Sequence, residues 1–327
     1  MKFLVLLFFS LSVSAKTFKV GVLAPEGTAW SENLKKLTKE VKKATEGRVK
    51  FKIYYGGAQG DEPDVLRKIR VRQLHGGVFT GKTLGDINGD VRVIELPFTF
   101  IDDREKAWKT LNSMKEFFNK TFEDKGFKNL GFFEIGQVYF VSQKKTDTLD
   151  SLKGIKIWSW QGDELVTTLV NSMNLVSVPL PLPDVLSSLS TGVVEAAYAP
   201  PLGIVALQWN TKIKYIIDFP LAYSIGAFLI NKKEWDKVSD ADKKAVTDLA
   251  DTYIAKVNLA NVKDNKDALS SMKELGVEFL NFPEKDLAAA KSYRKEVLEK
   301  LTGNLFSKDA LSKLEAKLKD EESTKKN

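Results

Sequence analysis

The chain has 327 residues, 43% of them hydrophobic, which exceeds the size of one simple core and suits two domains of ordinary size. Its formal net charge is +7, but lysines alternate with acids along amphipathic segments, so we expect solvated helix faces and no nucleic-acid partner. There is no cysteine and one histidine, His75, so disulfides are excluded and a zinc site or a Ser-His-Asp triad has few possible members. We therefore expect no metal, no cofactor and no enzymatic activity.

The first 15 residues, MKFLVLLFFSLSVSA, have the pattern of a secretory signal peptide. Lys2 precedes an apolar run, and the Val-Ser-Ala ending predicts cleavage after Ala15. A membrane anchor is the competing interpretation, but the run from Phe3 to Val13 is shorter than the roughly 20 residues that span a bilayer. Because no cysteine can carry a lipid, we expect the mature protein to be free in the periplasm.

Strands and helices alternate along the next part of the chain. Apolar spacing and turn residues predict strands at 18–24, 48–57 and 76–81, helices at 28–47, 62–74 and 105–126, and an extended segment at 127–143. Such alternation is typical of a mostly parallel sheet that carries helices on both faces.

A second unit of the same kind follows. It is predicted as strands at 154–160, 175–180 and 193–200 with helices at 163–174 and 182–192. Residues 240–276 predict one helix long enough to brace both units, and the charged tail at 309–327 is expected to fray. We predict an α/β fold of two lobes, of the type II periplasmic binding protein kind, with a ligand cleft between them. Lobe I takes residues 16–138 and 225–262, and lobe II takes 139–224 and 263–327.

Two tryptophans stand at the end of the strand at 154–160. Strand alternation puts Trp158 and Trp160 on one face, at the carboxyl end, where ligands bind in α/β proteins. Large aromatic residues in such strands also serve as ordinary core. Both interpretations are open on this pattern alone.

Several segments together resemble the substrate-binding receptors of tripartite ATP-independent periplasmic (TRAP) transporters. The resemblance runs from about Phe18 to Val238 and rests on these segments in order: VLAPEGTAW, YYGGAQGDEPDVLRKIRVRQLHGGVFTGKTLGDI, ELPFTFIDD, LKGIKIW, VPLPLPDVLSSLSTGVVEAAYAPP and FLINKKEWDKV. It implies a receptor that passes its ligand to TRAP membrane subunits driven by an ion gradient. A subgroup of the family works with a tetratricopeptide-repeat lipoprotein, and the resemblance extends to that subgroup.

The resemblance also carries an expectation about the ligand. In acid-binding members, an arginine in the LKGLKIR segment pairs with the ligand carboxylate, aided by a second arginine and an asparagine. These positions fall on Trp158, near Val138 and near Ala199, so all three polar partners are absent. Because an unpaired carboxylate in a cleft costs several kcal/mol, we expect a hydrophobic or amphipathic ligand.

The other expected ligand contacts lie on neighbouring strand ends and loops. They are Trp160, Tyr139, Tyr198, Pro200, Trp30 and Gln59. Strand alternation puts Tyr139 on the face opposite Val138, so only one of the two is expected to line the cleft well. Trp30 serves equally as a wall of the cleft or as a staple of its own helix.

Alternatives to this function follow from the same segments. Asp163 is predicted to cap a helix, and the amino end of that helix offers backbone N–H groups to an anionic head group. The first rival therefore keeps the fold but binds a polar or carboxylate ligand through backbone groups. The others are a periplasmic lipid carrier that needs no transporter and a hydrolase that uses His75 or Asp163.

Overall fold

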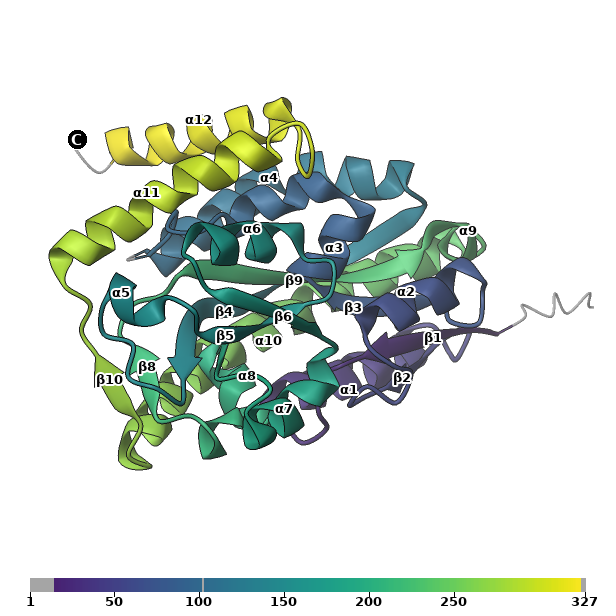
Figure 1. Ribbon diagram of the computed structural model, residues 1–327. Helices are drawn as coiled ribbons and strands as arrows, with labels where there is room; N and C mark the ends of the chain where they lie inside the picture. The colour runs from purple at the N-terminus through teal and green to yellow at the C-terminus, as the bar shows by residue number, and fades with distance from the viewer. Residues whose placement is uncertain (1–14, 102, 325–327) are drawn as a thin grey trace, which may run out of the picture.

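The structure is a computed structural model that describes residues 15–101 and 103–324. The predicted signal peptide, apart from Ala15, lies outside the described residues. Within the described ranges, none of the helices has the length and apolar character that crossing a membrane requires. Strands run through the middle of the molecule and helices cover both sides of them (Figure 1).

One mixed sheet connects the two lobes. Over the described residues its strand order is β2-β1-β3-β9-β4-β7-β5-β6, with β8 beside β4 and β10 beside β8. In the first lobe, the parallel strands are β2 (Val49–Tyr54), β1 (Lys16–Val22) and β3 (Gly76–Thr80). β9 (Ala222–Asn231) lies antiparallel between β3 and the long strand β4 (Phe127–Ser142).

β4 also begins the second half of the sheet. Its residues 139–142 pair antiparallel with β7 (Ala196–Ala199), and β5 (Lys156–Trp160) runs parallel to β7 and β6 (Val176–Leu180). β8 (Tyr215–Ile217) pairs with β4 and with β10 (Glu278–Leu280). The continuous strand β4 therefore passes from one lobe to the other.

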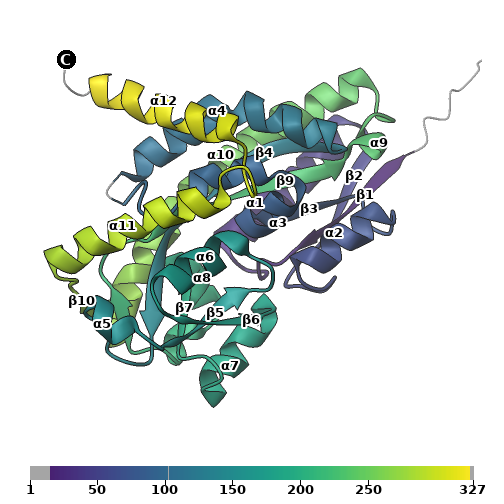
Figure 2. The same cartoon turned by 45° about the horizontal axis from the view of Figure 1, so that its top comes forward.

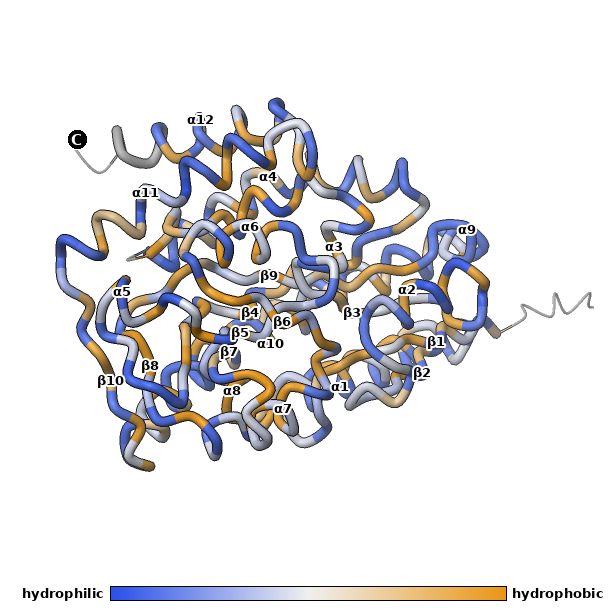
Figure 3. Tube along the Cα trace, in the orientation of Figure 1, coloured by the Kyte–Doolittle hydropathy of each residue, from blue (hydrophilic) through white to orange (hydrophobic). Residues whose placement is uncertain are grey.

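Helices cover the sheet on both faces (Figure 2). Those before β5 are α1 (Ala29–Ala44), α2 (Glu62–Arg70), α3 (Gly81–Ile87), the 3₁₀ helix η1 (Gly89–Glu95), α4 (Arg104–Asp124) and α5 (Leu149–Leu152). Those after β5 are α6 (Glu164–Ser172), η2 (Leu182–Asp184), α7 (Val185–Thr191), α8 (Pro201–Ala206), η3 (Trp209–Thr211), α9 (Lys232–Trp235), α10 (Asp240–Glu274), α11 (Glu284–Leu301) and α12 (Lys308–Thr324). Hydrophobic residues concentrate on the strands and on the inward faces of the helices (Figure 3).

The long helix α10 contacts elements of both lobes. It packs on α1 and β4 and also on α8. Asn258 and Asn261 donate to the carbonyl oxygens of Phe132 and Glu134, where the register of β4 against β9 shifts. These amides satisfy backbone groups that the irregular ladder leaves without strand partners. A helix that bridges both lobes was predicted, and it is present.

The fold class agrees with the prediction of a two-lobed α/β protein. The sheet is mixed because β4 and β9 run against their neighbours, while the outer strands of each half are parallel. The division of residues between the lobes stays a prediction. Within it, the segment given to lobe II includes α12, which packs against α4 and η1 (Figure 2).

Candidate functional site

A cavity of about 240 Å³ lies where strands of both halves end. Thr80 closes β3, Trp160 closes β5 and Ala199 closes β7, and all three line the cavity. The carboxyl ends of parallel strands form ligand sites in α/β folds. The cavity therefore lies where the topology favours a ligand.

Four aromatic side chains line the cavity, and we call them the aromatic wall: Trp158, Trp160, Tyr198 and Trp209. The Trp158 ring stacks on Tyr198 with centroids 5.0 Å apart and meets Trp209 edge-on at 5.4 Å. Trp160 lies beside Trp158 at 5.6 Å, as expected for alternate residues of one strand. The aromatic wall offers a ligand a rigid apolar surface.

Trp158 is both a core residue and a cavity residue. Its side chain is 2% exposed, and its indole N–H donates to the Leu180 carbonyl at 3.0 Å. Its only polar atom is therefore already satisfied, so what it presents to the cavity is apolar. The two interpretations left open by the sequence both hold for this side chain.

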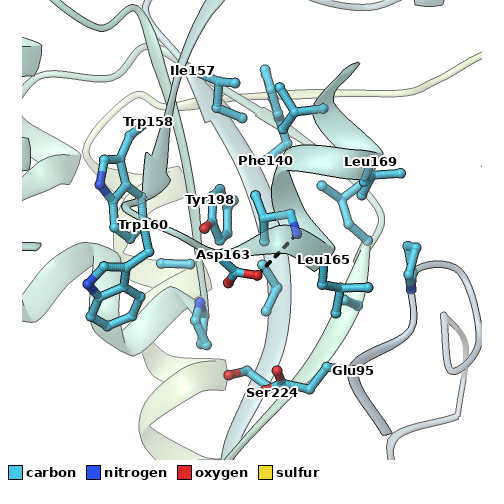
Figure 4. A pocket seen from close by; sticks show the side chains of 18 of the residues that line it. Glu95, Phe140, Ile157, Trp158, Trp160, Asp163, Leu165, Leu169, Tyr198 and Ser224 are labelled. Atoms are coloured by element: carbon cyan, nitrogen blue, oxygen red, sulfur yellow. Dashed lines mark hydrogen bonds between the residues drawn. The ribbon is translucent and has the colours of Figure 1, made fainter. Parts of the chain in front are cut away.

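Aliphatic side chains face the aromatic wall across the cavity. Leu165 and Leu169 of α6 lie opposite Trp158 and Trp160, with Tyr198 and Asp163 between the two sides (Figure 4). Phe140 and Ile157 lie together at one end, and Glu95 and Ser224 at the other (Figure 4). The cavity thus has a long apolar body and a polar end.

Three buried charged residues in the cavity lining, Arg92, Glu95 and Asp163, form what we call the charged cluster. One Arg92 nitrogen, Nη2, donates to both Asp163 oxygens at 3.0 and 3.2 Å, and Nε lies 3.3 Å from a Glu95 oxygen. The exposed fractions of the three residues are 3%, 7% and 6%. A single guanidinium therefore faces two carboxylates inside the cavity.

Each carboxylate is also held by the backbone. Glu95 accepts the Ile225 N–H at 2.9 Å, and Asp163 accepts the Val166 N–H at 3.2 Å as the N-cap of α6. Burial raises the pKa of the Glu95 carboxyl, and Arg92 opposes that rise. The predicted helix cap at Asp163 is confirmed, and its carboxylate fills the amino end of α6 where an anionic head group was considered.

Tyr198 provides a polar atom in the middle of the cavity. Its hydroxyl is buried and, apart from a weak contact with the Trp160 backbone, has no hydrogen-bond partner among the described residues. Burial, aided by nearby Asp163, raises the pKa of Tyr198 well above its ordinary value, so the hydroxyl stays neutral. It can donate one hydrogen bond to a ligand and accept another.

A smaller cavity of about 160 Å³ adjoins the first through Trp160. Trp30 and Glu62 line it, and the Trp160 indole N–H donates to Asp61, the residue before α2, at 2.9 Å. Asp61 caps α2 by accepting the Glu62 N–H at 2.8 Å. Glu62 accepts the Thr80 N–H at 3.0 Å, and burial raises the pKa of Glu62 to about 8.

The residues expected to contact ligand divide into three groups. Those that line the main cavity are Trp158, Trp160, Val138, Tyr198, Ala199 and Pro200. Trp30 lines the smaller cavity and also packs in the core of lobe I against Phe133. Tyr139 and Gln59 line neither cavity: Tyr139 packs against the hydrophobic cluster that includes Trp158 and Trp209, and Gln59 accepts a hydrogen bond from Lys68. As ligand contacts, all of them stay predictions.

The charged cluster was missed by the sequence analysis except for Asp163. Arg92 and Glu95 lie on the 3₁₀ helix η1, whose short irregular backbone gives no helix or strand period. A signal was present, since both charges interrupt the apolar run VRVIELPF. Charges inside such a run are expected to be paired if the run is buried.

His75 lies away from both cavities. Its Nδ1 accepts the Lys19 backbone N–H at 3.0 Å, and its ring packs edge-on against Phe18. Burial lowers the pKa of His75, so the ring is neutral near pH 7. His75 is therefore a histidine bonded to the backbone and packed on the core of the first lobe.

Comparison with known proteins adds a family match. The profile described as bacterial extracellular solute-binding protein, family 7, matches residues 20–304. The 2,3-diketo-L-gulonate-binding periplasmic protein of Escherichia coli is 22% identical over 275 residues, covering 82% of each chain. These matches agree with the resemblance found in the sequence.

Two solved structures are similar in fold. A sugar acid binding protein of Advenella mimigardefordensis in complex with galactonate has a TM-score of 0.86 at 20% identity, over 94% of this chain and 99% of that one. A TRAP periplasmic solute binding protein of Desulfovibrio salexigens with bound orotic acid has a TM-score of 0.84 at 21% identity, over 92% and 98%. On ligand class, these proteins favour the polar or carboxylate alternative over a hydrophobic ligand.

Proposed function

Because this chain belongs to family 7 of the bacterial extracellular solute-binding proteins, the TRAP receptors, we propose that its cleft captures a hydrophobic or amphipathic small molecule for TRAP membrane subunits. Proteins of this family are periplasmic binding proteins and not enzymes. The family also supplies the partner, since a TRAP receptor works with TRAP membrane subunits. A tetratricopeptide-repeat partner stays a prediction from the resemblance.

The main support for a hydrophobic or amphipathic ligand is that the described residues of the cavity lining include no cation without an acidic partner. Its two cations are Arg92, held by Glu95 and Asp163, and Lys82, whose Nζ lies 2.6 Å from Asp86. The remaining walls are mainly aromatic and aliphatic. A desolvated carboxylate would lack a charged partner here, whereas an apolar body would be in contact with the wall throughout.

A carboxylate or other polar ligand is the second candidate, and the known ligands of similar proteins favour it. Galactonate and orotic acid are the ligands of the two similar structures. The Tyr198 hydroxyl and the backbone at the strand ends are the groups that would have to hold such a molecule. An amphipathic ligand with one small polar group is compatible with the same hydroxyl.

Binding of matched probes tests the two candidates. Protein purified without denaturation is titrated with the apolar fluorophore N-phenyl-1-naphthylamine and, separately, with galactonate and galacturonate. We expect the fluorophore to bind and the sugar acids not to bind. Trp158→Ala should weaken fluorophore binding by on the order of 1–3 kcal/mol.

The control is Trp235→Ala, which removes a buried tryptophan that lines neither cavity. It should lower the melting temperature but leave affinity per folded molecule unchanged. Native mass spectrometry of the same preparation identifies any retained ligand. Tight galactonate binding, or a retained sugar acid, would establish the second candidate instead.

A further inference from the structure

The charged cluster joins the two lobes inside the cavity. Arg92 and Glu95 come from η1, which packs on β9 and α4 of the first lobe. Asp163 comes from the turn between β5 and α6 in the second lobe. The ion pair between Arg92 and Asp163 therefore connects the two lobes directly.

Glu95 fixes the guanidinium from the first-lobe side. A Cβ on Gly81 would lie 1.8 Å from a Glu95 oxygen, so the carboxylate fills the space that the glycine leaves. Its other oxygen accepts the Ile225 N–H at 2.9 Å. With Glu95 held in place, Arg92 directs Nη2 at the second lobe, where it meets Asp163.

The cluster carries one positive and two negative charges when all three groups are ionised. An incoming carboxylate would add a further negative charge beside this excess in a site shielded from water. It would also find the Arg92 nitrogen that faces the second lobe occupied by both Asp163 oxygens. A neutral head group meets neither obstacle.

We propose that Asp163 is a built-in counter-ion that occupies the cleft arginine and thereby excludes acids from the ligand site. The chain itself supplies the carboxylate that an acid ligand would otherwise bring. This inference rests on the proposed function, because it assigns the choice between a neutral ligand and an acid to one residue. Asp163 is thus a specificity-determining residue, and the same carboxylate also caps α6.

Replacement of the carboxylate by a free acid tests the proposal directly. Asp163→Gly removes a CH₂COO⁻ group that acetate can replace, and glycine is an acceptable N-cap. We expect 100 mM acetate to raise the melting temperature of this variant by ~2–4 °C in a saturable manner. Wild type should not respond, nor should Asp150→Asn, which removes an exposed charge paired with Lys153.

Selectivity provides the second measurement. Octanoate and octanamide have the same chain and differ in head-group charge, and binding of each is followed by calorimetry. We expect wild type to prefer octanamide, and Asp163→Gly to shift the ratio of affinities toward octanoate by about tenfold or more. If Asp163→Gly does not fold, Asp163→Ser with formate takes its place, because serine also caps helices.

The possible failures are distinct. A folded variant that neither responds to acetate nor changes the octanoate ratio overturns the role of Asp163. Wild type that ignores octanamide and N-phenyl-1-naphthylamine but binds galactonate overturns the proposed function. In that case the acetate response of Asp163→Gly still decides whether Asp163 occupies Arg92.

Discussion

The two sides of the cleft differ in the kind of side chain they supply. The first lobe contributes three buried titratable side chains, Glu62, Arg92 and Glu95, which are fixed by backbone N–H groups or by one another. The second lobe contributes the aromatic wall, whose rings stack on one another. Among the described residues of the cleft, contacts that cross between the sides include those from Arg92 to Asp163 and from Trp160 to Asp61.

This difference separates two tasks of the cleft. Contact with apolar rings favours ligands by size and shape, because burial of apolar area has little direction. Buried charges instead require a partner of opposite sign at a defined position, so they determine which head groups can enter and whether the lobes can close. Changes to the two sides should therefore have different consequences.

The largest effect is expected when the charged side loses its cation. Arg92→Met leaves Glu95 and Asp163 buried without a counter-ion, and removal of one partner of a buried ion pair costs about 3–5 kcal/mol. We expect the free energy of unfolding, measured by urea denaturation, to fall by that amount. Arg67→Met is the control, since Arg67 is 70% exposed and pairs with Asp64 at the surface.

A compensated variant distinguishes lost packing from unpaired charge. Arg92→Met combined with Glu95→Gln and Asp163→Asn has no charge in the cluster and should recover much of the lost stability. If Arg92→Met alone were as stable as Arg67→Met, the charged cluster would contribute little to the closed fold. The expected difference between the charged and the aromatic side of the cleft would then be wrong for the charged side.

Glu62 can be compared with Glu95 and Asp163, because it is a buried carboxyl group that has no arginine partner among the described residues. Its folded-state pKa of about 8 lies above the ordinary 4.5, since burial disfavours the charged form. The folded protein thus prefers protonated Glu62, and this stabilisation is complete below pH 4.5 and is lost as the pH rises to about 8.

The expected result is a pH-dependent difference between wild type and Glu62→Gln. Relative to the variant, wild type should lose on the order of a few kcal/mol between pH 5 and pH 9. Melting temperatures of both proteins across this range measure the loss, and other titrating groups cancel in the difference. A flat difference curve would mean that Glu62 is ionised throughout, held by its bonds from Thr80.

Much of the fold followed from local patterns in the sequence. The helix predicted at 28–47 is α1 at Ala29–Ala44, and the strand predicted at 76–81 is β3 at Gly76–Thr80. In these segments the spacing of apolar residues and the positions of turn residues predict the same elements that the folded structure contains. α11 and β10 were not predicted, and β9 was represented only by a segment of the family resemblance. β9 takes its place by pairing with β3 and β4, which are distant in the sequence.

The cavity residues likewise divide into those that local sequence patterns could predict and those that they could not. Trp158, Tyr198 and Ala199 could be placed near a cleft because strand ends in α/β folds meet at one edge. Arg92 could not, since its burial depends on where η1 lies against β9 and on the arrival of Asp163 from the other lobe. Contacts between residues of different lobes produce no periodic hydrophobic pattern in the sequence, so such a pattern cannot predict them.

The smallest expected effect concerns the second crossing bond, between Trp160 and Asp61. Trp160→Phe keeps an aromatic ring but removes the N–H. Asp61→Ser removes the carboxylate oxygen Oδ2 that accepts this bond, while the serine Oγ can still cap α2. Because the bond is half-buried and connects the lobes, each change should weaken binding of N-phenyl-1-naphthylamine. The pair should be worth about 1 kcal/mol.

A double-mutant cycle isolates that bond from the other losses. If the Trp160 N–H and the Asp61 carboxylate act only through each other, the double variant should be weaker than wild type by about 1 kcal/mol less than the sum of the single changes. Additivity to within ~0.3–0.5 kcal/mol would mean that the bond does not hold the lobes together in the liganded protein. Of these two contacts between the lobes, only the Arg92–Asp163 ion pair would then stabilise the closed arrangement. The charged cluster would in that case both determine which head group binds and hold the two lobes together.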